Sequence, residues 1–100
     1  MNVEKAIRMA VDTGKVKFGS ESALDAVLKT GTKLLIISSN CSEEVGGELK
    51  RLARLSEIPV FVFEDSSIEL GSVCGKPFPV SALSIFEPGD SSVLELVEKQ

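Results

Sequence analysis

One stretch of the sequence decides the fold class: Leu34-Leu35-Ile36-Ile37, followed directly by Ser38-Ser39-Asn40-Cys41-Ser42. Four consecutive apolar residues are typical of a β-strand that is covered on both faces, as in a sheet between two layers of helices. The polar residues lead to Ser42, a suitable helix N-cap, because Glu43 and Glu44 then stand at the positive end of the helix dipole. The stretch predicts a strand, a loop and a helix, which is the unit of an α/β fold.

Helical spacing of apolar residues predicts two helices before this unit. The first ends at Gly14 and carries an apolar stripe made of Val3, Ile7, Ala10 and Val11. The second begins at Ser20 as a candidate N-cap and ends at Gly31. The residues that it is expected to bury are Ala23, Leu24, Val27 and Leu28.

Three helical segments are predicted after the strand. The first continues from Ser42 with the apolar stripe Val45, Leu49, Leu52 and Ala53. The second is a short helix that Ser66 and Glu69 open as a capping box and that ends near Gly75. The third is a terminal helical turn capped by Asp90, with an apolar stripe of Val93, Leu94 and Val97.

Further strands are predicted where Val16 and Phe18 alternate with lysines, over residues 60–63 as a second buried strand, and over residues 80–86. Strands that alternate with helices imply a βαβ-type sheet layered between helices. A chain of 100 residues with 43% apolar and 26% charged side chains suits one domain, residues 1–100. Charges interrupt the apolar runs of the first 20 residues, which argues against a signal peptide. The longest apolar runs, residues 34–37 and 58–63, are too short to span a bilayer, so we expect a soluble, cytoplasmic protein without a membrane partner.

The charge balance opposes generic nucleic-acid binding. Eleven basic and fifteen acidic side chains leave a net charge of −4. Residues 1–33 hold six basic and four acidic side chains, and residues 34–100 hold five and eleven. RNA binding would therefore need a local basic patch, for which the candidates are Lys15, Lys17, Lys29, Lys33 and Lys76.

Enzymatic chemistry has little support in the sequence. The chain has no histidine, and Cys41 and Cys74 are its only cysteines, so we expect free thiols, no metal, no cofactor and no catalysis. Asp12-Thr13-Gly14 matches the active-site triplet of aspartic proteases, but it ends a predicted helix, where Gly14 is a suitable C-cap. Residues 71–76 are similar to a phosphate-binding P-loop but follow a helix and have Pro77 at the magnesium-ligand position.

Three loops are candidates for a binding surface. The loops around Gly19 and Asn40 each follow a strand and lead into a helix, whose free N–H groups can hold phosphate oxygens. Such loops are also ordinary connectors. The third loop carries Phe78 between Pro77 and Pro79, which stiffen the backbone. The ring of Phe78 either plugs the core or offers a flat face to a ligand such as a nucleobase.

An ordered set of motifs resembles a known family. It runs through Asp12-Thr13-Gly14-Lys15, Gly19, Lys33 to Ile37 with Asn40, Ala53-Arg54-Leu55-Ser56, Ile58-Pro59-Val60, Glu69-Leu70-Gly71, Gly75-Lys76 with Phe78 and Val80, and Pro88-Gly89-Asp90-Ser91. Together they resemble the archaeal and eukaryotic "thirty-e" proteins of the large ribosomal subunit, in the superfamily of kink-turn RNA-binding proteins. In lacking extensions, the chain resembles the archaeal form of these proteins.

The resemblance implies a three-layer α/β/α sandwich with a four-stranded mixed β-sheet. It implies a structural protein without enzymatic activity that binds a kink-turn of ribosomal RNA and touches neighbouring large-subunit proteins. We expect a monomer when the protein is off the ribosome. The resemblance implies some of the RNA-binding residues, and we add their neighbours and two candidate lysines. The full set is Gly19, Ser20, Glu21, Lys33, Asn40, Lys76, Phe78 and Val80.

Two positions depart from the family pattern. Glu21 stands where members often carry a basic residue, and Val45 followed by Gly46-Gly47 replaces another basic position. Each change should remove a phosphate contact and flatten the salt dependence of RNA binding. These departures and the net charge support a second hypothesis, an acidic protein-interaction adaptor on the same fold, similar to the growth-arrest stress adaptors of the superfamily.

Overall fold

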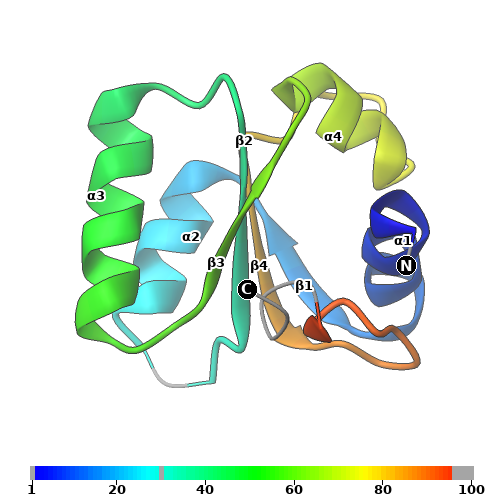
Figure 1. Ribbon diagram of the computed structural model, residues 1–100, viewed down its shortest axis with the longest axis horizontal. Helices are drawn as coiled ribbons and strands as arrows, with labels where there is room; N and C mark the ends of the chain where they lie inside the picture. Colours follow the sequence, from blue (N-terminus) through cyan, green and yellow to red (C-terminus); the bar gives the residue numbers. More distant parts are fainter. Residues whose placement is uncertain (1, 30, 96–100) are drawn as a thin grey trace.

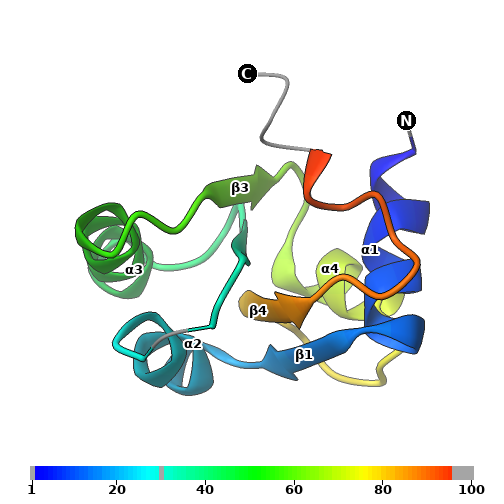
Figure 2. The same ribbon diagram turned by 90° about the horizontal axis from the view of Figure 1, so that it is seen from below.

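The chain folds into three layers, described here by a computed structural model of residues 2–29 and 31–95 (Figure 1). Its elements in chain order are α1 (Val3–Thr13), β1 (Lys15–Phe18), α2 (Ser20–Val27), β2 (Leu34–Ser38), α3 (Glu43–Leu55), β3 (Val60–Phe63), α4 (Ser67–Val73) and β4 (Ala82–Glu87). Helices α2 and α3 cover one face of the sheet, and α1 and α4 cover the other (Figure 2). The prediction of an α/β/α sandwich with a four-stranded mixed sheet is confirmed.

The strand order is β1-β4-β2-β3, with β2 and β3 parallel and β4 antiparallel to both of its neighbours. The last strand of the chain therefore lies between β1 and β2. Three strands run in one direction, so the carboxyl ends of β1, β2 and β3 meet the start of β4 at the same edge of the sheet. We call this the loop edge; it is uppermost in Figure 1.

Strand β2 separates two hydrophobic cores. All five of its residues are buried. Leu34 and Ile36 pack with α1 and α4, whereas Leu35 and Ile37 pack with α2 and α3. Alternate side chains of a strand point to opposite faces, so the uninterrupted apolar run supplies both cores, as the sequence predicted.

Of the four predicted N-caps, Ser42 and Ser66 are confirmed, and Ser20 and Asp90 are wrong. The Ser42 hydroxyl accepts from the Val45 N–H at 3.3 Å, and the Ser66 hydroxyl accepts from the Glu69 N–H at 3.4 Å. Ser20 is instead the first residue of α2, and Gly19 occupies the N-cap position. Helix α2 also ends at Val27, so the predicted burial of Leu28 is wrong, and this side chain is 70% exposed.

The later strands also differ from the prediction. Residues 60–63 form an edge strand rather than a buried one, and Val62 is 44% exposed. Strand β4 begins at Ala82 rather than at residue 80. Near the end of the chain Ser91, not Asp90, accepts from the Val93 N–H, at 3.0 Å, and the predicted role of Val97 lies outside the described residues.

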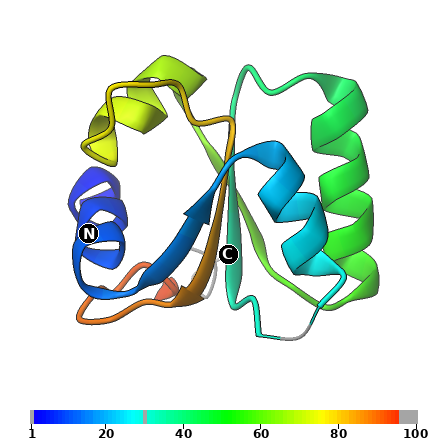
Figure 3. The same cartoon turned by 180° about the vertical axis from the view of Figure 1, so that it is seen from behind.

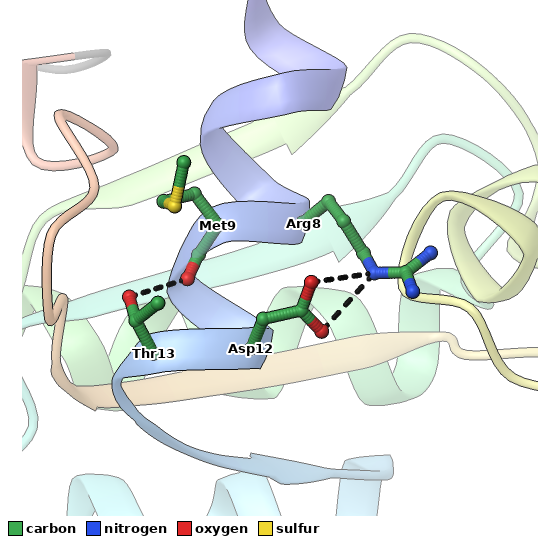
Figure 4. Close-up of polar contacts among 4 residues, drawn as sticks. All are labelled: Arg8, Met9, Asp12 and Thr13. Carbon is green, nitrogen blue, oxygen red and sulfur yellow. Dashed lines mark hydrogen bonds and ion pairs between the residues drawn. The ribbon is translucent and has the colours of Figure 1, made fainter.

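The Asp12-Thr13-Gly14 triplet is the end of helix α1, as expected (Figure 4). The Asp12 carboxylate pairs with the Arg8 guanidinium at 3.0 Å, one helical turn back. The Thr13 hydroxyl donates to the Met9 carbonyl at 2.7 Å, and the Gly14 N–H donates to Ala10 O at 2.8 Å. The polar groups of the triplet serve the helix terminus, and a protease-like site is excluded at this position.

Candidate nucleic-acid interface

Backbone hydrogen bonds gather the three candidate loops at the loop edge. The Gly19 N–H donates to Ala82 O at 2.9 Å and joins the β1–α2 loop to the start of β4. The Ser38 N–H donates to Ser81 O at 2.9 Å and joins the end of β2 to the same segment. Figure 3 shows the loop edge from behind, where the α4–β4 loop descends beside the turn from β1 into α2. The sheet therefore places the loops of Gly19, Asn40 and Phe78 side by side.

Gly19 leaves the start of α2 open. Its φ of 104° and ψ of 150° belong to a region that essentially only glycine occupies, and a Cβ built there would meet no atom within 4 Å. Helix α2 has no side-chain cap, whereas α1, α3 and α4 are capped by Asn2, Ser42 and Ser66. N–H groups in the first turn of α2, including those of Ser20 and the exposed Glu21, therefore remain free to bind an anion.

Phe78 lies on the surface rather than in the core. Its side chain is 47% exposed, on the loop that Pro77 and Pro79 stiffen. The ring meets Phe18 in a T-shaped arrangement, with centroids 6.3 Å apart, and Lys76 Nζ lies 5.1 Å from the Phe18 centroid. We call these three residues the aromatic corner. Because Phe18 immediately precedes Gly19, the aromatic corner adjoins the open start of α2.

The Phe78 loop rests directly on α4. A Cβ built on Gly71 would lie 2.1 Å from the Phe78 carbonyl oxygen, so only glycine permits this approach. Val80 anchors the other end of the loop, because its N–H donates to Ser67 O at 2.9 Å and its side chain is 1% exposed. The expectation that Val80 itself packs on a nucleotide does not fit this burial. Its side chain belongs to the core beneath the loop.

Asn40 connects two loops of the edge. Its Oδ1 accepts from the Ser67 N–H at 2.8 Å and from the Ser38 hydroxyl at 3.0 Å. A backbone N–H can only donate, so the atom facing Ser67 is the oxygen, and the amide nitrogen is the end left to bind a ligand. Asn40 is thus both a structural clamp and an exposed donor, whereas the sequence analysis treated these roles as alternatives.

The predicted basic patch does not form at this edge. Lys33 precedes β2, and its N–H donates to Ile85 O at 2.8 Å, which places Lys33 at the opposite edge of the sheet. Lys15 begins β1 and Lys29 follows α2, so they also lie away from the loop edge. Lys33 therefore lies at the far end of the sheet from Gly19, Asn40 and Phe78, whereas Lys76 lies beside the Phe18 ring and Lys17 directly precedes Phe18. Acidic residues border the loop edge instead, at the starts of α2 and α3 and after the end of β3: Glu21, Glu43, Glu44, Glu64 and Asp65.

The buried thiol of Cys74 is poorly suited to nucleophilic chemistry. Burial raises the pKa of Cys74 to about 11, although Lys76 and Arg8 partly offset this, so the thiol stays protonated at neutral pH. Cys41 is half-buried, and both cysteines are free. In the part of the chain that the structure describes, no three His, Cys, Asp or Glu residues are grouped to hold a metal ion, and no helix is both long and apolar enough to cross a membrane.

Sequence reasoning missed the roles of three residues at this edge. Phe18 was placed at the end of its strand, in the loop with Gly19, but its contact with the Phe78 ring was not predicted. Ser67 joins Asn40 to Val80 through its backbone, and no side-chain signal reveals that role. Ile68 follows Ser67 and is 67% exposed. The sequence does not indicate this exposure, because a single apolar residue in a short amphipathic helix can face either the core or the solvent.

The fold and the loop edge define a class: an α/β/α sandwich with an uncapped helix start, an exposed aromatic ring and an amide donor along one rim. The chain belongs to the ribosomal protein L7Ae/L30e/S12e/Gadd45 family, whose model matches residues 1–95. It is similar to the large ribosomal subunit protein eL30 of Methanosphaera stadtmanae, with 50% identity over 98 residues, 98% of this chain and 100% of the relative. The same protein of Methanocaldococcus jannaschii is 47% identical over 100 residues, 100% of this chain and 91% of the relative. The resemblance seen in the sequence is confirmed.

Proposed function

We propose that this protein is an RNA-binding component of the large ribosomal subunit in the cytoplasm and that its loop edge binds a kink-turn of ribosomal RNA. The family match and the names of the similar proteins support the ribosomal role. The observation that carries the RNA site is the exposed Phe78 ring beside the open start of α2. A sharply bent RNA turns a base out of its stack and brings its phosphates close together. The Phe78 ring is the partner for the base, and the open start of α2 is the partner for a phosphate.

Each part of the edge has a separate task in this mechanism. The Phe78 ring stacks on the unpaired base, which is worth roughly 1–3 kcal/mol. The free N–H groups at the start of α2 bind a phosphate, and Gly19 lets the RNA backbone approach closely because it has no side chain. The Asn40 amide nitrogen donates to a base edge next to the bend.

The role is structural and not catalytic. Rigid loops fixed by backbone hydrogen bonds suit a protein that holds an RNA bend in place. We propose that residues 1–100 act as one RNA-binding domain, monomeric in free solution, which contacts neighbouring proteins once it is on the subunit.

RNA binding by a matched pair of variants tests this proposal. The wild-type chain should bind an RNA with a kink-turn more tightly than the same helix without the bend, in a gel-shift titration. Phe78→Ala should weaken binding to the kinked RNA by about tenfold or more, in line with the loss of one stacked base. Leu55→Ala is the control, because this side chain is 70% exposed and ends α3, away from the loop edge. Equal binding by all three proteins would remove Phe78 from the site.

One observation favours a second candidate, the acidic protein-interaction adaptor. Five carboxylates border the loop edge, and a phosphate backbone would be repelled by them. The same titration separates the two functions, because an adaptor would bind kinked and straight RNA equally weakly.

A further inference from the structure

The two edges of the sheet are built differently. At one edge, β1 exposes Lys15 and Lys17, which alternate with the half-buried Val16 and Phe18. Charged side chains, lysines above all, keep an edge strand from pairing with another chain. At the other edge, β3 has the sequence Val-Phe-Val-Phe and no charged side chain. The β1 edge is therefore protected against added strands, whereas no strand of the described residues pairs with the outer side of β3.

The backbone of β3 has hydrogen-bonding groups that point outward. The Leu35 N–H donates to Pro59 O at 3.0 Å, and Val62 stands opposite Ile37 in the parallel register. In a parallel pair, alternate residues of a strand bond to the neighbour, so Pro59, Phe61 and Phe63 face β2. Val60 and Val62 direct their N–H and C=O groups away from the sheet. Among the described residues, no hydrogen bond from outside the sheet engages these groups.

A groove runs along this edge between β3 and α3. It has a volume of about 360 Å³ and is lined by Lys50, Arg54, Ile58, Val60 and Val62. Figure 2 shows β3 at the outer end of the sheet with α3 beside it. Val62 and Lys50 also line a second hollow of about 300 Å³, which continues the groove toward the loop edge past Gly46 and Gly47. The groove thus has an apolar floor beneath a basic rim.

The basic rim is electrostatically unpaired. Arg51 of α3 forms an ion pair with Glu48 at 2.6 Å, but in the described part of the chain neither Lys50 nor Arg54 has such a partner. Two unpaired cations in a chain of net charge −4 mark a local reversal of sign. The groove is complementary to carboxylates.

The opposite face of β3 has the reverse character. There Phe61 and Phe63 line a hollow of about 140 Å³, bordered by Glu4, Glu64 and Asp65. A strand that pairs with β3 would alternate its side chains between the two faces. It would need acidic residues toward α3 and apolar or basic residues toward α1.

We propose that β3 accepts an extended segment of a partner protein as a fifth strand, with acidic side chains in the groove beneath Lys50 and Arg54 and apolar side chains over Phe61. Main-chain pairing supplies the attachment, and the alternating side chains supply the selectivity. A second copy of this chain is a poor occupant, because antiparallel pairing of two β3 strands would bring both α3 helices, with Lys50 and Arg54, to the same face. An RNA strand would meet the cations but would leave the outward backbone groups of Val60 and Val62 without partners.

A designed peptide tests this surface on the full-length protein. The probe is a short synthetic strand in which glutamate alternates with valine, titrated into isotope-labelled protein and followed by amide chemical shifts. The largest shifts should fall on Val60, Val62 and their neighbours. Reversing both charges with Lys50→Glu and Arg54→Glu should weaken binding by about tenfold, as expected for two close charge pairs at a rim. Lys5→Glu on α1 is the control and should bind the probe as the wild type does.

Two further probes test the backbone and the charge contributions separately. A peptide methylated on alternate amide nitrogens cannot form the ladder and should lose binding, and a lysine–valine peptide should bind more weakly than the glutamate–valine one. Phe78→Ala should bind the probe normally, which separates this surface from the RNA site. Equal binding to the charge-reversed protein, or no effect of methylation, would overturn the proposal. Concentration-dependent dimerisation through β3, or loss of kinked-RNA binding in the charge-reversed protein, would assign the edge to another occupant.

Discussion

The side-chain oxygen of Asn40 accepts a hydrogen bond from the backbone N–H of Ser67 at 2.8 Å, and it thereby ties the β2–α3 loop to the start of α4. The clamp uses one end of the amide and leaves the nitrogen at the surface. The structural role and the proposed RNA-binding role therefore reside on different atoms of one side chain, and a single substitution can separate them.

Asn40→Asp should keep the clamp and lose the donor. A carboxylate still accepts from Ser67 and Ser38, so the free energy of unfolding should stay within about 0.5 kcal/mol of the wild type, as for substitutions that preserve buried contacts. RNA affinity should fall, because a donor is replaced by a negative charge. Asn40→Ala should lower both quantities, with a cost of about 0.5–1.5 kcal/mol for the lost hydrogen bond to the Ser67 N–H. Urea unfolding and RNA titration of both variants check this; a large loss of stability in Asn40→Asp would contradict it.

Gly71→Ala should disturb the aromatic corner. The new Cβ would stand 2.1 Å from the Phe78 carbonyl oxygen, so α4 and the Phe78 loop must move apart. Overpacking of this kind costs roughly 1–3 kcal/mol. Gly47→Ala is a matched control in a helix, since a Cβ there meets no atom within 4 Å. It should raise the free energy of unfolding by roughly 0.5–1 kcal/mol through helix propensity alone. Opposite signs for the two glycines in thermal or urea unfolding are the expected result.

Glu21→Lys should tighten RNA binding. The exposed Glu21 stands in the first turn of α2, beside the proposed phosphate position. A lysine there should add about one phosphate contact and steepen the dependence of log K on log salt by about 0.7–0.9. The lysine also opposes the helix dipole, at a cost of about 0.3–1 kcal/mol in stability. Glu21→Gln separates the effects, because it removes the repulsion without adding a contact. An unchanged salt dependence in Glu21→Lys would place the RNA elsewhere.

The burial of Cys74 predicts that the free energy of unfolding falls at alkaline pH. The folded chain holds the pKa of this thiol at about 11, above its ordinary value of 9.0, because the thiol is buried. Stability is therefore full below pH 9.0 and declines as the pH rises toward 11, since the unfolded chain loses its proton first. Cys74→Ala should show a smaller decline across this window than the wild type, measured by urea unfolding at a series of alkaline pH values.

Local physics made much of the fold predictable. The apolar run of β2 indicated a strand between two cores, and Ser42 and Ser66 marked helix starts, because each feature depends on neighbours within a few residues. Gly19 and Asn40 were found by the rule that loops at the carboxyl ends of parallel strands share an edge.

The errors arose where distant segments decide the outcome. Val80 looked like a surface residue of the Phe78 loop, but its hydrogen bond to Ser67 draws it into the core. Strand β3 resembles β2 in composition, and only the strand order shows that it lies at the edge. The position of Lys33 could have been predicted from the sequence alone, because it precedes its strand and so belongs to the opposite end of the sheet.

The position of β4 between β1 and β2 bears on synthesis at the ribosome. The β1–α2 loop takes its place by bonding to Ala82, which emerges long after Gly19 has left the exit tunnel. A nascent or prematurely terminated chain that stops before Ala82 leaves β1 without its neighbour in the sheet. The loop edge is therefore complete only once Ala82 has been made, and a chain that stops earlier lacks the scaffold of the proposed RNA site.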